Sequence, residues 1–204
     1  MNMRERFIKG YYRLLGKAVR PMSDKGVTPN VISLFSLCLS LISALFYGMG
    51  YFFAGGIMLL LSGFTDTLDG TIARIRGKST RFGALLDSTL DRYAEFFVFT
   101  GLLIHFRTGW MFYIVITALI GSIMVSYVKA RAESLGSTKI IGLMQRPERF
   151  ILLALGSLLN APMGIYFPES PDCIIKTVLI LLAILTNITA IQRLVGEKKD
   201  LSKV

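Results

Sequence analysis

The sequence predicts an all-α membrane protein with six transmembrane helices preceded by an amphipathic juxtamembrane helix. Its 204 residues are 53% hydrophobic and only 18% charged, whereas a soluble domain is roughly 45–50% apolar and about a quarter charged. The mean hydropathy is +0.58. This composition excludes a disordered chain and an ordinary cytosolic enzyme. Much of the net charge of +10 flanks apolar stretches, which favours a membrane surface as partner over nucleic acid.

Six apolar segments have the length of membrane spans, at roughly 20 residues per helix. Their expected bounds are 31–49, 51–73, 82–106, 110–128, 150–166 and 174–195. The fifth is short for a bilayer, so we expect it to tilt little or to be partly shielded from lipid. The sequence shows no internal repeat and no second domain. We therefore expect one membrane domain over residues 1–204, with a six-helix bundle over 31–195.

The N-terminal segment, residues 1–25, carries seven Lys and Arg residues among apolar positions that recur at helical spacing, including Phe7, Tyr11 and Leu15. This pattern is typical of an amphipathic helix that lies on an anionic membrane leaflet. A solvated basic tail is the alternative. The segment has no long apolar region and no cleavage site, so it does not match a signal peptide.

The distribution of basic residues predicts the orientation of the spans. The N-terminus, the two connections after the second and fourth spans, and the C-terminal tail hold 20 of the 23 Lys and Arg residues. The opposite side has only Arg107 and Lys176. We therefore expect an integral protein of the cell membrane with both termini on the cytoplasmic side.

Five acidic residues lie in or beside the second and third spans: Asp66, Asp69, Asp87, Asp91 and Glu95. An aspartate at the centre of a membrane helix costs about 2.5–3.5 kcal/mol, so these residues need partners or water. Asp66 and Asp69 are three residues apart and Asp87 and Asp91 four apart, so each pair shares one helix face. The link between the spans is short and makes them antiparallel neighbours. The four aspartates should therefore converge near the cytoplasmic end.

Four carboxylates at one place cannot all ionise unless cations join them. Carboxylate oxygens suit Mg²⁺, Mn²⁺ or Ca²⁺, and two ions shared by four carboxylates would form a two-metal centre. Gly70, Ala73 and Arg74 follow the first aspartate pair. Glycine allows close approach to the backbone, alanine keeps the helix surface shallow, and arginine makes bidentate contacts to phosphate. Together these residues indicate a pyrophosphate ligand.

Two other interpretations of the acidic cluster are structural ion pairs and a pathway for divalent cations. A cation transporter would spread its acids through the depth of the bilayer or carry an inverted repeat. Here the acids are grouped at one end of the spans, and no repeat is visible.

The string from Asp66 to Asp91 fits D-x₂-D-G-x₂-A-R-x₈-G-x₃-D-x₃-D at all eight fixed positions over 26 residues. This pattern resembles the signature of the CDP-alcohol phosphatidyltransferases, and the plan of six spans and the preceding TPN at 28–30 are also similar to that family. The resemblance implies a homodimeric membrane enzyme that transfers a phosphatidyl group from a CDP-linked lipid to an alcohol and releases CMP.

The resemblance also implies roles for particular residues. Asp66, Asp69, Asp87 and Asp91 would bind two divalent ions, Mg²⁺ or Mn²⁺, and Asp91 would also be the catalytic general base for the acceptor hydroxyl. The CDP portion of the donor would contact Pro29, Asn30, Val31, Ile32, Asp69, Gly70, Ala73, Arg74 and Thr80. The active site would face the cytoplasm.

The acceptor must be recognised by residues outside this signature. Basic residues gather in the connection between the fourth and fifth spans, and Arg193 lies at the end of the sixth. A cationic pocket there suits a phosphorylated polyol such as inositol 1-phosphate or glycerol 3-phosphate. Arg146 and Arg149 flank Pro147, which is typical of the first turn of a helix, where anions bind well. Lys129 is the base of the fourth span that we assign to this pocket.

The stretches SYVKARAE (126–133) and QRPER (145–149) resemble those of the bacterial phosphatidylinositol phosphate synthases and of the archaeal enzymes that use an archaeol donor. This implies an acceptor phosphate held by Lys129, Arg149 and Arg193, with Arg146 nearby. The expected reaction joins CDP-diacylglycerol and inositol 1-phosphate into phosphatidylinositol phosphate. A phosphatidylglycerol phosphate synthase or an archaetidylinositol phosphate synthase is the alternative.

Some roles remain open from the sequence. The positive-inside rule alone would also account for Arg149 and Arg193. Glu95 is suited either to accept hydrogen bonds from the acceptor or to pair with a neighbouring base, and Arg92 to a dimer contact or an internal ion pair.

Overall fold

The computed structural model describes residues 28–75, 80–137, 142–166, 169–170 and 172–201. Within these residues the chain forms six α-helices and no strand, which confirms the predicted all-α class. The helices are α2 (Pro29–Gly48), α3 (Phe52–Ile75), α4 (Arg81–His105), α5 (Met111–Ser134), α6 (Arg146–Tyr166) and α7 (Cys173–Leu201). The interfacial helix expected over residues 1–25 lies outside the described residues and stays a prediction.

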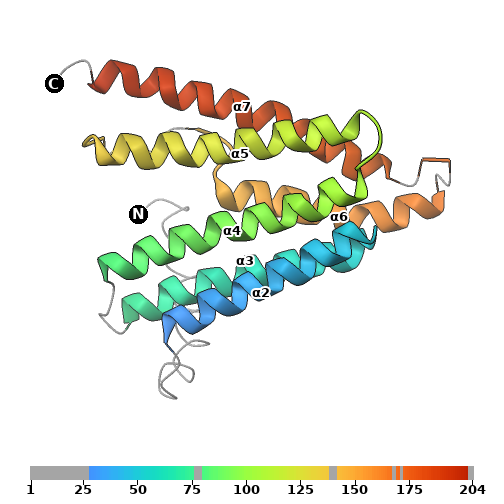
Figure 1. The fold of residues 1–204 in the computed structure, drawn as a ribbon, viewed down its shortest axis with the longest axis horizontal. Helices are drawn as coiled ribbons and strands as arrows, with labels where there is room; N and C mark the ends of the chain where they lie inside the picture. The colour runs from blue at the N-terminus through green and yellow to red at the C-terminus, as the bar shows by residue number, and fades with distance from the viewer. Residues whose placement is uncertain (1–27, 76–79, 138–141, 167–168, 171, 202–204) are drawn as a thin grey trace, which may run out of the picture.

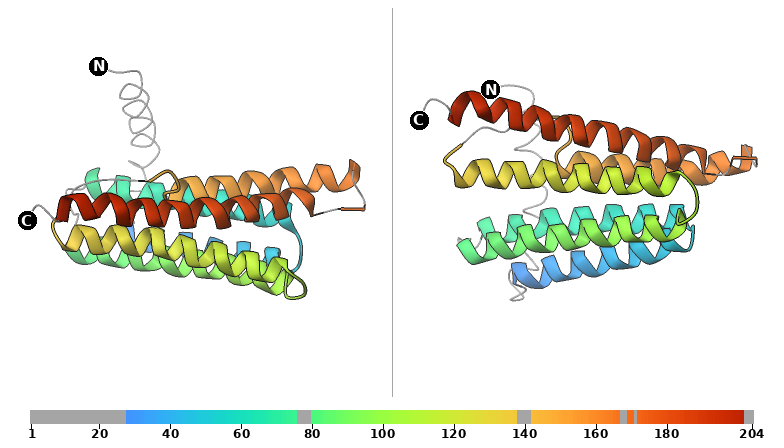
Figure 2. Two further views of the ribbon diagram at one scale, coloured as in Figure 1. Left: turned by 90° about the horizontal axis from the view of Figure 1, so that it is seen from above. Right: turned by 45° about the horizontal axis from the view of Figure 1, so that its top comes forward.

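The helices form one bundle with roughly parallel and antiparallel axes (Figures 1 and 2). α2 packs against both α3 and α4, α3 packs against α6, and α5 packs against α7. Further contacts join α6 to α7 and α4 to α5. α3 and α4 run in opposite directions, so the end of α3 and the start of α4 lie at the same end of the bundle (Figure 1). α6 begins part of the way along the bundle, so its first turn lies within the bundle and not at its end (Figure 1).

Small residues allow α2 to lie close to the two helices that carry the acidic residues. Ser62 Oγ of α3 lies 2.7 Å from Ser40 Oγ and 3.0 Å from Ser36 Oγ of α2. Such hydroxyl groups satisfy each other in apolar surroundings and let helix backbones approach. On α4, a Cβ added at Gly101 would meet the backbone of Ala44, so this crossing requires glycine. α2 thereby fixes the positions of α3 and α4.

The bundle is apolar both inside and on much of its outer surface. Large hydrophobic side chains such as Phe35 and Tyr113 are 58% and 70% exposed, whereas a soluble monomer rarely exposes large apolar patches. Three helices are long and apolar enough to cross a membrane: Pro29–Gly48, Met111–Ser134 and Cys173–Lys198. The segment Phe52–Leu68 is a shorter apolar helix. These features are those of a membrane protein.

Several helices extend beyond the apolar segments from which they were predicted. α5 continues to Ser134 instead of ending at 128, α6 begins at Arg146 instead of 150, and α7 continues to Leu201 instead of ending at 195. The expected bounds were wrong here because apolar residues mark only the part suited to lipid, whereas a helix keeps its backbone hydrogen bonds through charged residues. The charged residues at these ends are therefore held on helical turns.

Candidate active site

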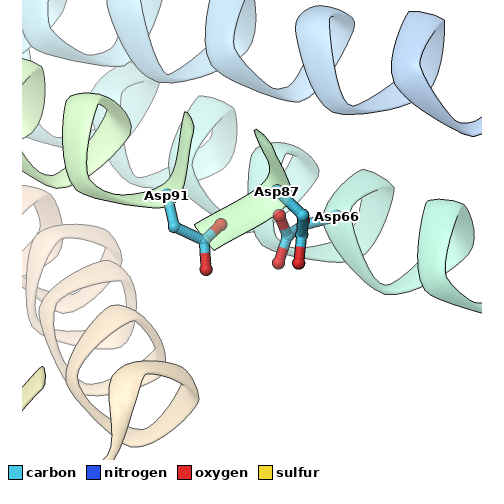
Figure 3. A group of neighbouring side chains, drawn as sticks. All are labelled: Asp66, Asp87 and Asp91. Atoms are coloured by element: carbon cyan, nitrogen blue, oxygen red, sulfur yellow. The ribbon is translucent and has the colours of Figure 1, made fainter. Parts of the chain in front are cut away.

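Three of the four aspartates predicted to bind metal come together. Asp66 projects from α3, and Asp87 and Asp91 project from successive turns of α4. One carboxylate oxygen of each lies within 4.8 Å of the others, and the three carboxylates turn toward the same space (Figure 3). All three residues are partly buried. Asp69 lies one turn beyond Asp66 on α3, and its side chain is outside the described part of the chain.

A cationic side chain lies among these carboxylates. Arg146, the first residue of α6, places Nη1 2.6 Å from Asp66 Oδ2 and 2.7 Å from Asp91 Oδ1. Its guanidinium carbon is 4.9 Å from the centre of the Phe150 ring. Carboxylates this close repel one another unless a cation neutralises them. The site therefore fits a bound cation, and its hard oxygen donors are the ligands that Mg²⁺ and Mn²⁺ take in proteins.

A cavity of about 640 Å³ opens beside the cluster. Two of the aspartates, Asp87 and Asp91, line it. The four residues predicted to bind the acceptor phosphate also line it, from three different helices: Lys129 on α5, Arg146 and Arg149 on α6, and Arg193 on α7. The structure thus brings the predicted acceptor residues together, next to the predicted general base.

The arginines of this cavity are fixed by hydrogen bonds. Arg149 is 3% exposed, and its Nε and Nη2 donate to Glu95 Oε1 at 3.1 and 2.8 Å. Its Nη1 donates to the Met144 carbonyl at 3.0 Å. Burial lowers the pKa of the Arg149 guanidinium, and the charge of Glu95 opposes that shift. Arg193, 4% exposed, donates from Nη1 to the Val125 carbonyl at 2.6 Å.

Two questions left open by the sequence are answered by these contacts. Glu95 pairs with neighbouring bases, because its Oε2 also accepts from Arg92 Nη1 at 3.2 Å. Arg92 accordingly takes part in an internal ion pair. Lys129 is less constrained than the arginines, with a side chain that is 42% exposed and 3.7 Å from Glu133.

Some residues expected to contact the CDP portion lie on α3 and at the start of α4. Thr80 is the N-cap of α4, and its Oγ1 accepts a hydrogen bond from the Gly83 N–H at 2.9 Å. This cap sets where α4 begins and so where its aspartates lie. Gly70 is half-buried on α3, and the side chains of Ala73 and Arg74 lie outside the described residues.

The other expected donor residues form the first turn of α2. Pro29 is the first residue of the helix, where its missing N–H leaves no bond unmade. Asn30 and Val31 are exposed, whereas Ile32 is only 3% exposed and belongs to the core. This turn lies at the same end of the bundle as the start of α4 (Figure 1).

An apolar groove of about 310 Å³ lies between α3 and α6 and leads to the carboxylate cluster. Asp66 and Arg146 line one part of it. The remaining lining is mostly apolar and includes Leu59, Leu60, Phe64, Phe150 and Ile151. A polar centre is thus continuous with an apolar groove, an arrangement suited to an amphipathic ligand.

Sequence reasoning did not find the contact of Arg146 with Asp66 and Asp91. The signal available was a matched spacing. Asp91 and Glu95 are one turn apart on α4, and Arg146 and Arg149 are one turn apart on α6. Each arginine contacts one of these acids. Arg146 Nη1 lies 2.7 Å from Asp91 Oδ1, and Arg149 Nη2 lies 2.8 Å from Glu95 Oε1.

Comparison with known proteins identifies the family of this chain. The sequence profile described as CDP-alcohol phosphatidyltransferase matches residues 26–191. The chain therefore belongs to the CDP-alcohol phosphatidyltransferase family. It is a phospholipid-synthesising transferase, which confirms the resemblance found from the aspartate signature.

Among curated relatives, the chain is 37% identical over 174 residues to the phosphatidylinositol phosphate synthase of Mycobacteroides abscessus, covering 83% of this chain and 76% of that protein. It is 35% identical over 184 residues to the archaetidylinositol phosphate synthase of Pyrococcus horikoshii, covering 89% of each. The names of both relatives describe the synthesis of an inositol phosphate lipid, phosphatidylinositol phosphate in one and archaetidylinositol phosphate in the other.

Among solved structures, the chain is similar to the phosphatidylinositol phosphate synthase of Mycobacterium tuberculosis. The crystal structure with CDP-DAG bound superimposes with a TM-score of 0.79 at 35% identity and covers 91% of this chain and 94% of that one. The structure of the same enzyme in complex with manganese and citrate also gives a TM-score of 0.79, at 34% identity and 90% and 88% coverage.

We predict that Arg146→Gln destabilises the protein in the absence of divalent ions. The unfolding free energy should fall by about 1–3 kcal/mol, less than the roughly 3–5 kcal/mol of a fully buried pair, because these side chains remain 16–24% exposed. Mn²⁺ should then raise the melting temperature of the variant more than that of the wild type, because a divalent cation balances the same carboxylates.

Thermal unfolding in detergent, with EDTA or with Mn²⁺, measures both effects. Arg131→Gln is the control, because it removes the same charge from an exposed position near the end of α5. An equal Mn²⁺-induced shift in the wild type and in Arg146→Gln would contradict the assignment of Arg146 as the counter-ion of the cluster.

Proposed function

We propose that this chain transfers a phosphatidyl group from CDP-diacylglycerol to inositol 1-phosphate and releases phosphatidylinositol phosphate and CMP. The observation that carries the proposal is the cavity in which Asp87 and Asp91 face Lys129, Arg149 and Arg193. A cationic pocket beside a carboxylate cluster suits an acceptor that presents both a hydroxyl and a phosphate. The names of the mycobacterial relatives support the same acceptor.

The proposed donor is supported by the apolar groove between α3 and α6. Its lining residues, among them Phe64 and Ile151, offer an apolar surface for acyl chains, while Asp66 and Arg146 lie where a pyrophosphate would reach the cluster. CDP-DAG is the ligand of the mycobacterial synthase of similar fold. The nucleotide is proposed to contact Asp69, Gly70, Ala73, Arg74 and Thr80 and the first turn of α2 at 29–32.

Two divalent ions, Mg²⁺ or Mn²⁺, are proposed to bind to Asp66, Asp69, Asp87 and Asp91. The converging carboxylates of the described three support this assignment, as does the manganese complex of the mycobacterial synthase. Bound ions would neutralise the pyrophosphate of the donor. A divalent ion that takes the carboxylate oxygens now bound by Arg146 would displace this side chain, and the cavity beside it gives the side chain a place to go.

Asp91 is the proposed general base. It lines the acceptor cavity and is one of the clustered carboxylates, so it lies between the two proposed substrates. The acceptor hydroxyl oxygen would form a bond to the phosphorus that carries the diacylglycerol, and the bond from that phosphorus to the CMP oxygen would break. The hydroxyl proton passes to the Asp91 carboxylate, and CMP leaves as the anion. Lys129, Arg149 and Arg193, with Arg146, hold the acceptor phosphate.

The membrane arrangement proposed from the sequence completes this function. Six transmembrane helices and an interfacial helix at 1–25 would place the carboxylates and both termini on the cytoplasmic side, where nucleotide-linked lipids and sugar phosphates meet. The clustered aspartates Asp66, Asp87 and Asp91 belong to the halves of α3 and α4 that meet at one end of the bundle, which is the end that the sequence assigns to the cytoplasm. A homodimer is proposed from the family resemblance.

A second candidate function is archaetidylinositol phosphate synthesis. It uses the same proposed acceptor with an archaeol-linked donor, and it is favoured by the similarity to the Pyrococcus horikoshii enzyme over 89% of this chain. Phosphatidylglycerol phosphate synthesis is the alternative for a smaller phosphorylated acceptor.

An acceptor panel tests the proposed function. We predict that CMP is released from CDP-diacylglycerol in the presence of Mg²⁺ and inositol 1-phosphate, and that free inositol and serine give no release, because they lack the phosphate that the cationic cavity binds. CMP formation in liposomes, measured by chromatography, gives the result. Release with glycerol 3-phosphate alone would reject the acceptor while keeping the family. Release only with CDP-archaeol would establish the second candidate.

We also predict that Asp91→Asn lowers turnover by about 10²–10⁴-fold, the usual contribution of a general base. The amide keeps the size of the side chain but does not accept the proton. Rates of CMP release report turnover, and circular dichroism reports folding. Asp172→Asn is the matched control, since Asp172 pairs with His105 at the far end of α4. Wild-type turnover in Asp91→Asn would reject Asp91 as the base.

A further inference from the structure

Glu95 is a buried carboxylate that the aspartate signature does not include. It lies on α4 one turn beyond Asp91 and is only 1% exposed. Both of its oxygens accept hydrogen bonds from arginines. Oε1 accepts from Nε and Nη2 of Arg149, and Oε2 accepts from Nη1 of Arg92 at 3.2 Å. Among the described residues that line the acceptor cavity, both arginines occur and Glu95 does not. Glu95 therefore lies behind the arginines.

The hydrogen bonds of Arg149 leave it little freedom. A guanidinium has five N–H donors. Two go to Glu95, one to the Met144 carbonyl and one to Ser126 Oγ at 3.4 Å. Within the described residues this leaves one N–H, on Nη1, for a ligand in the cavity. The number of donors that Arg149 offers and their direction are thus determined by its partners, of which Glu95 is the charged one.

Glu95 also keeps Arg149 apart from the aspartate cluster. The first turn of α6 presents Arg146 and Arg149 to Asp91 and Glu95 of α4, and each arginine takes one acid. Removal of the Glu95 carboxylate would leave the buried guanidinium of Arg149 without its balancing charge. The acidic residues that line the same cavity are Asp87, Asp91 and Glu133. Arg149 would be drawn toward them and away from an acceptor phosphate.

The proposed reaction affects the pair of Arg146 with Asp91 but not the pair of Arg149 with Glu95. The attraction between Arg146 and Asp91 weakens when that carboxylate binds a divalent ion or takes a proton. The pair of Arg149 with Glu95 involves neither event, because Glu95 is outside the clustered carboxylates. It can therefore hold the first turn of α6 in place while Asp91 changes partners.

We propose that Glu95 is a positioning residue for the acceptor: it holds Arg149 with one N–H directed into the cavity and keeps this arginine off the metal-binding aspartates. The inference rests on the proposed function, in which Arg149 binds the acceptor phosphate. It adds a residue that acts through Arg149 without touching either substrate.

The test compares Michaelis constants for the two substrates. In Glu95→Gln the amide oxygen still accepts from Arg149, but the negative charge that balances the buried guanidinium is lost. We expect the KM for inositol 1-phosphate to rise about 5- to 20-fold, with a change of less than about twofold in the KM for CDP-diacylglycerol and a smaller change in kcat. Glu95→Asp keeps the charge but is one methylene shorter, so it should give an intermediate KM.

Two comparisons separate positioning from a general effect of charge or folding. Glu148→Gln removes the same charge from an exposed residue next to Arg149 and should leave both Michaelis constants unchanged. On a background of Arg149→Lys, Glu95→Gln should raise the acceptor KM no further, because the partner through which it acts is already changed. Melting temperatures in detergent show whether each variant is folded.

The possible outcomes are distinct. An unchanged acceptor KM in folded Glu95→Gln, or an additive effect with Arg149→Lys, would overturn the role of Glu95. Parallel changes in both Michaelis constants and kcat, together with a lower melting temperature, would overturn it in favour of a purely structural ion pair. If the wild type releases no CMP with inositol 1-phosphate or glycerol 3-phosphate, the proposed function itself fails, and the inference about Glu95 fails with it.

Discussion

The structure depends most on the balance of charge around Asp91. Three carboxylates from α3 and α4 lie within 4.8 Å of one another inside an otherwise apolar bundle, an arrangement that is unfavourable unless cations neutralise it. The bundle meets this requirement with Arg146 at the start of α6, while Arg149 on the same turn balances the neighbouring Glu95. The position of α6 is therefore tied to the acidic residues, and the same charge balance gives the site its capacity to bind divalent cations.

Helix α6 also separates two environments. On one side, Arg146 and Pro147 line the apolar groove shared with α3; on the other, they line the polar cavity shared with α5 and α7. In the proposed function, the lipid-linked donor and the phosphorylated acceptor approach the carboxylates from these two sides and meet at Asp91. Serine side chains join α2 to α3, and α2 crosses α4 closely at Gly101. These contacts hold α3 and α4, which carry the acidic residues, in fixed positions relative to each other.

The all-α class and the convergence of the aspartates could be predicted from the sequence because they depend on local spacing. Apolar runs of about 20 residues mark candidate spans, and separations of three and four residues place Asp87 and Asp91, like Asp66 and Asp69, on shared faces. The turn of α6 at Pro147 was also predictable, from the preference of proline for a first helical turn. The basic residues predicted to bind the acceptor, Lys129, Arg146, Arg149 and Arg193, line one cavity, and their role in binding stays a prediction.

The contacts of Arg146 were not predictable in this way, because they join residues far apart in the sequence, 80 positions for Asp66, and depend on where α6 begins within the bundle. The role of Glu95 was left open for a similar reason: its partner lies 54 positions away. Helix ends were misplaced where charged residues continue a helix beyond its apolar part, as in α5 and α7.

Anomalous diffraction from crystals grown with Mn²⁺ tests the central claim most directly. The account predicts a manganese peak between Asp66, Asp87 and Asp91, with Arg146 moved away from Asp66 and Asp91 and the pair of Arg149 with Glu95 unchanged. At saturating Mn²⁺, a peak elsewhere in the protein, or no peak with Arg146 still bound to both aspartates, would contradict it.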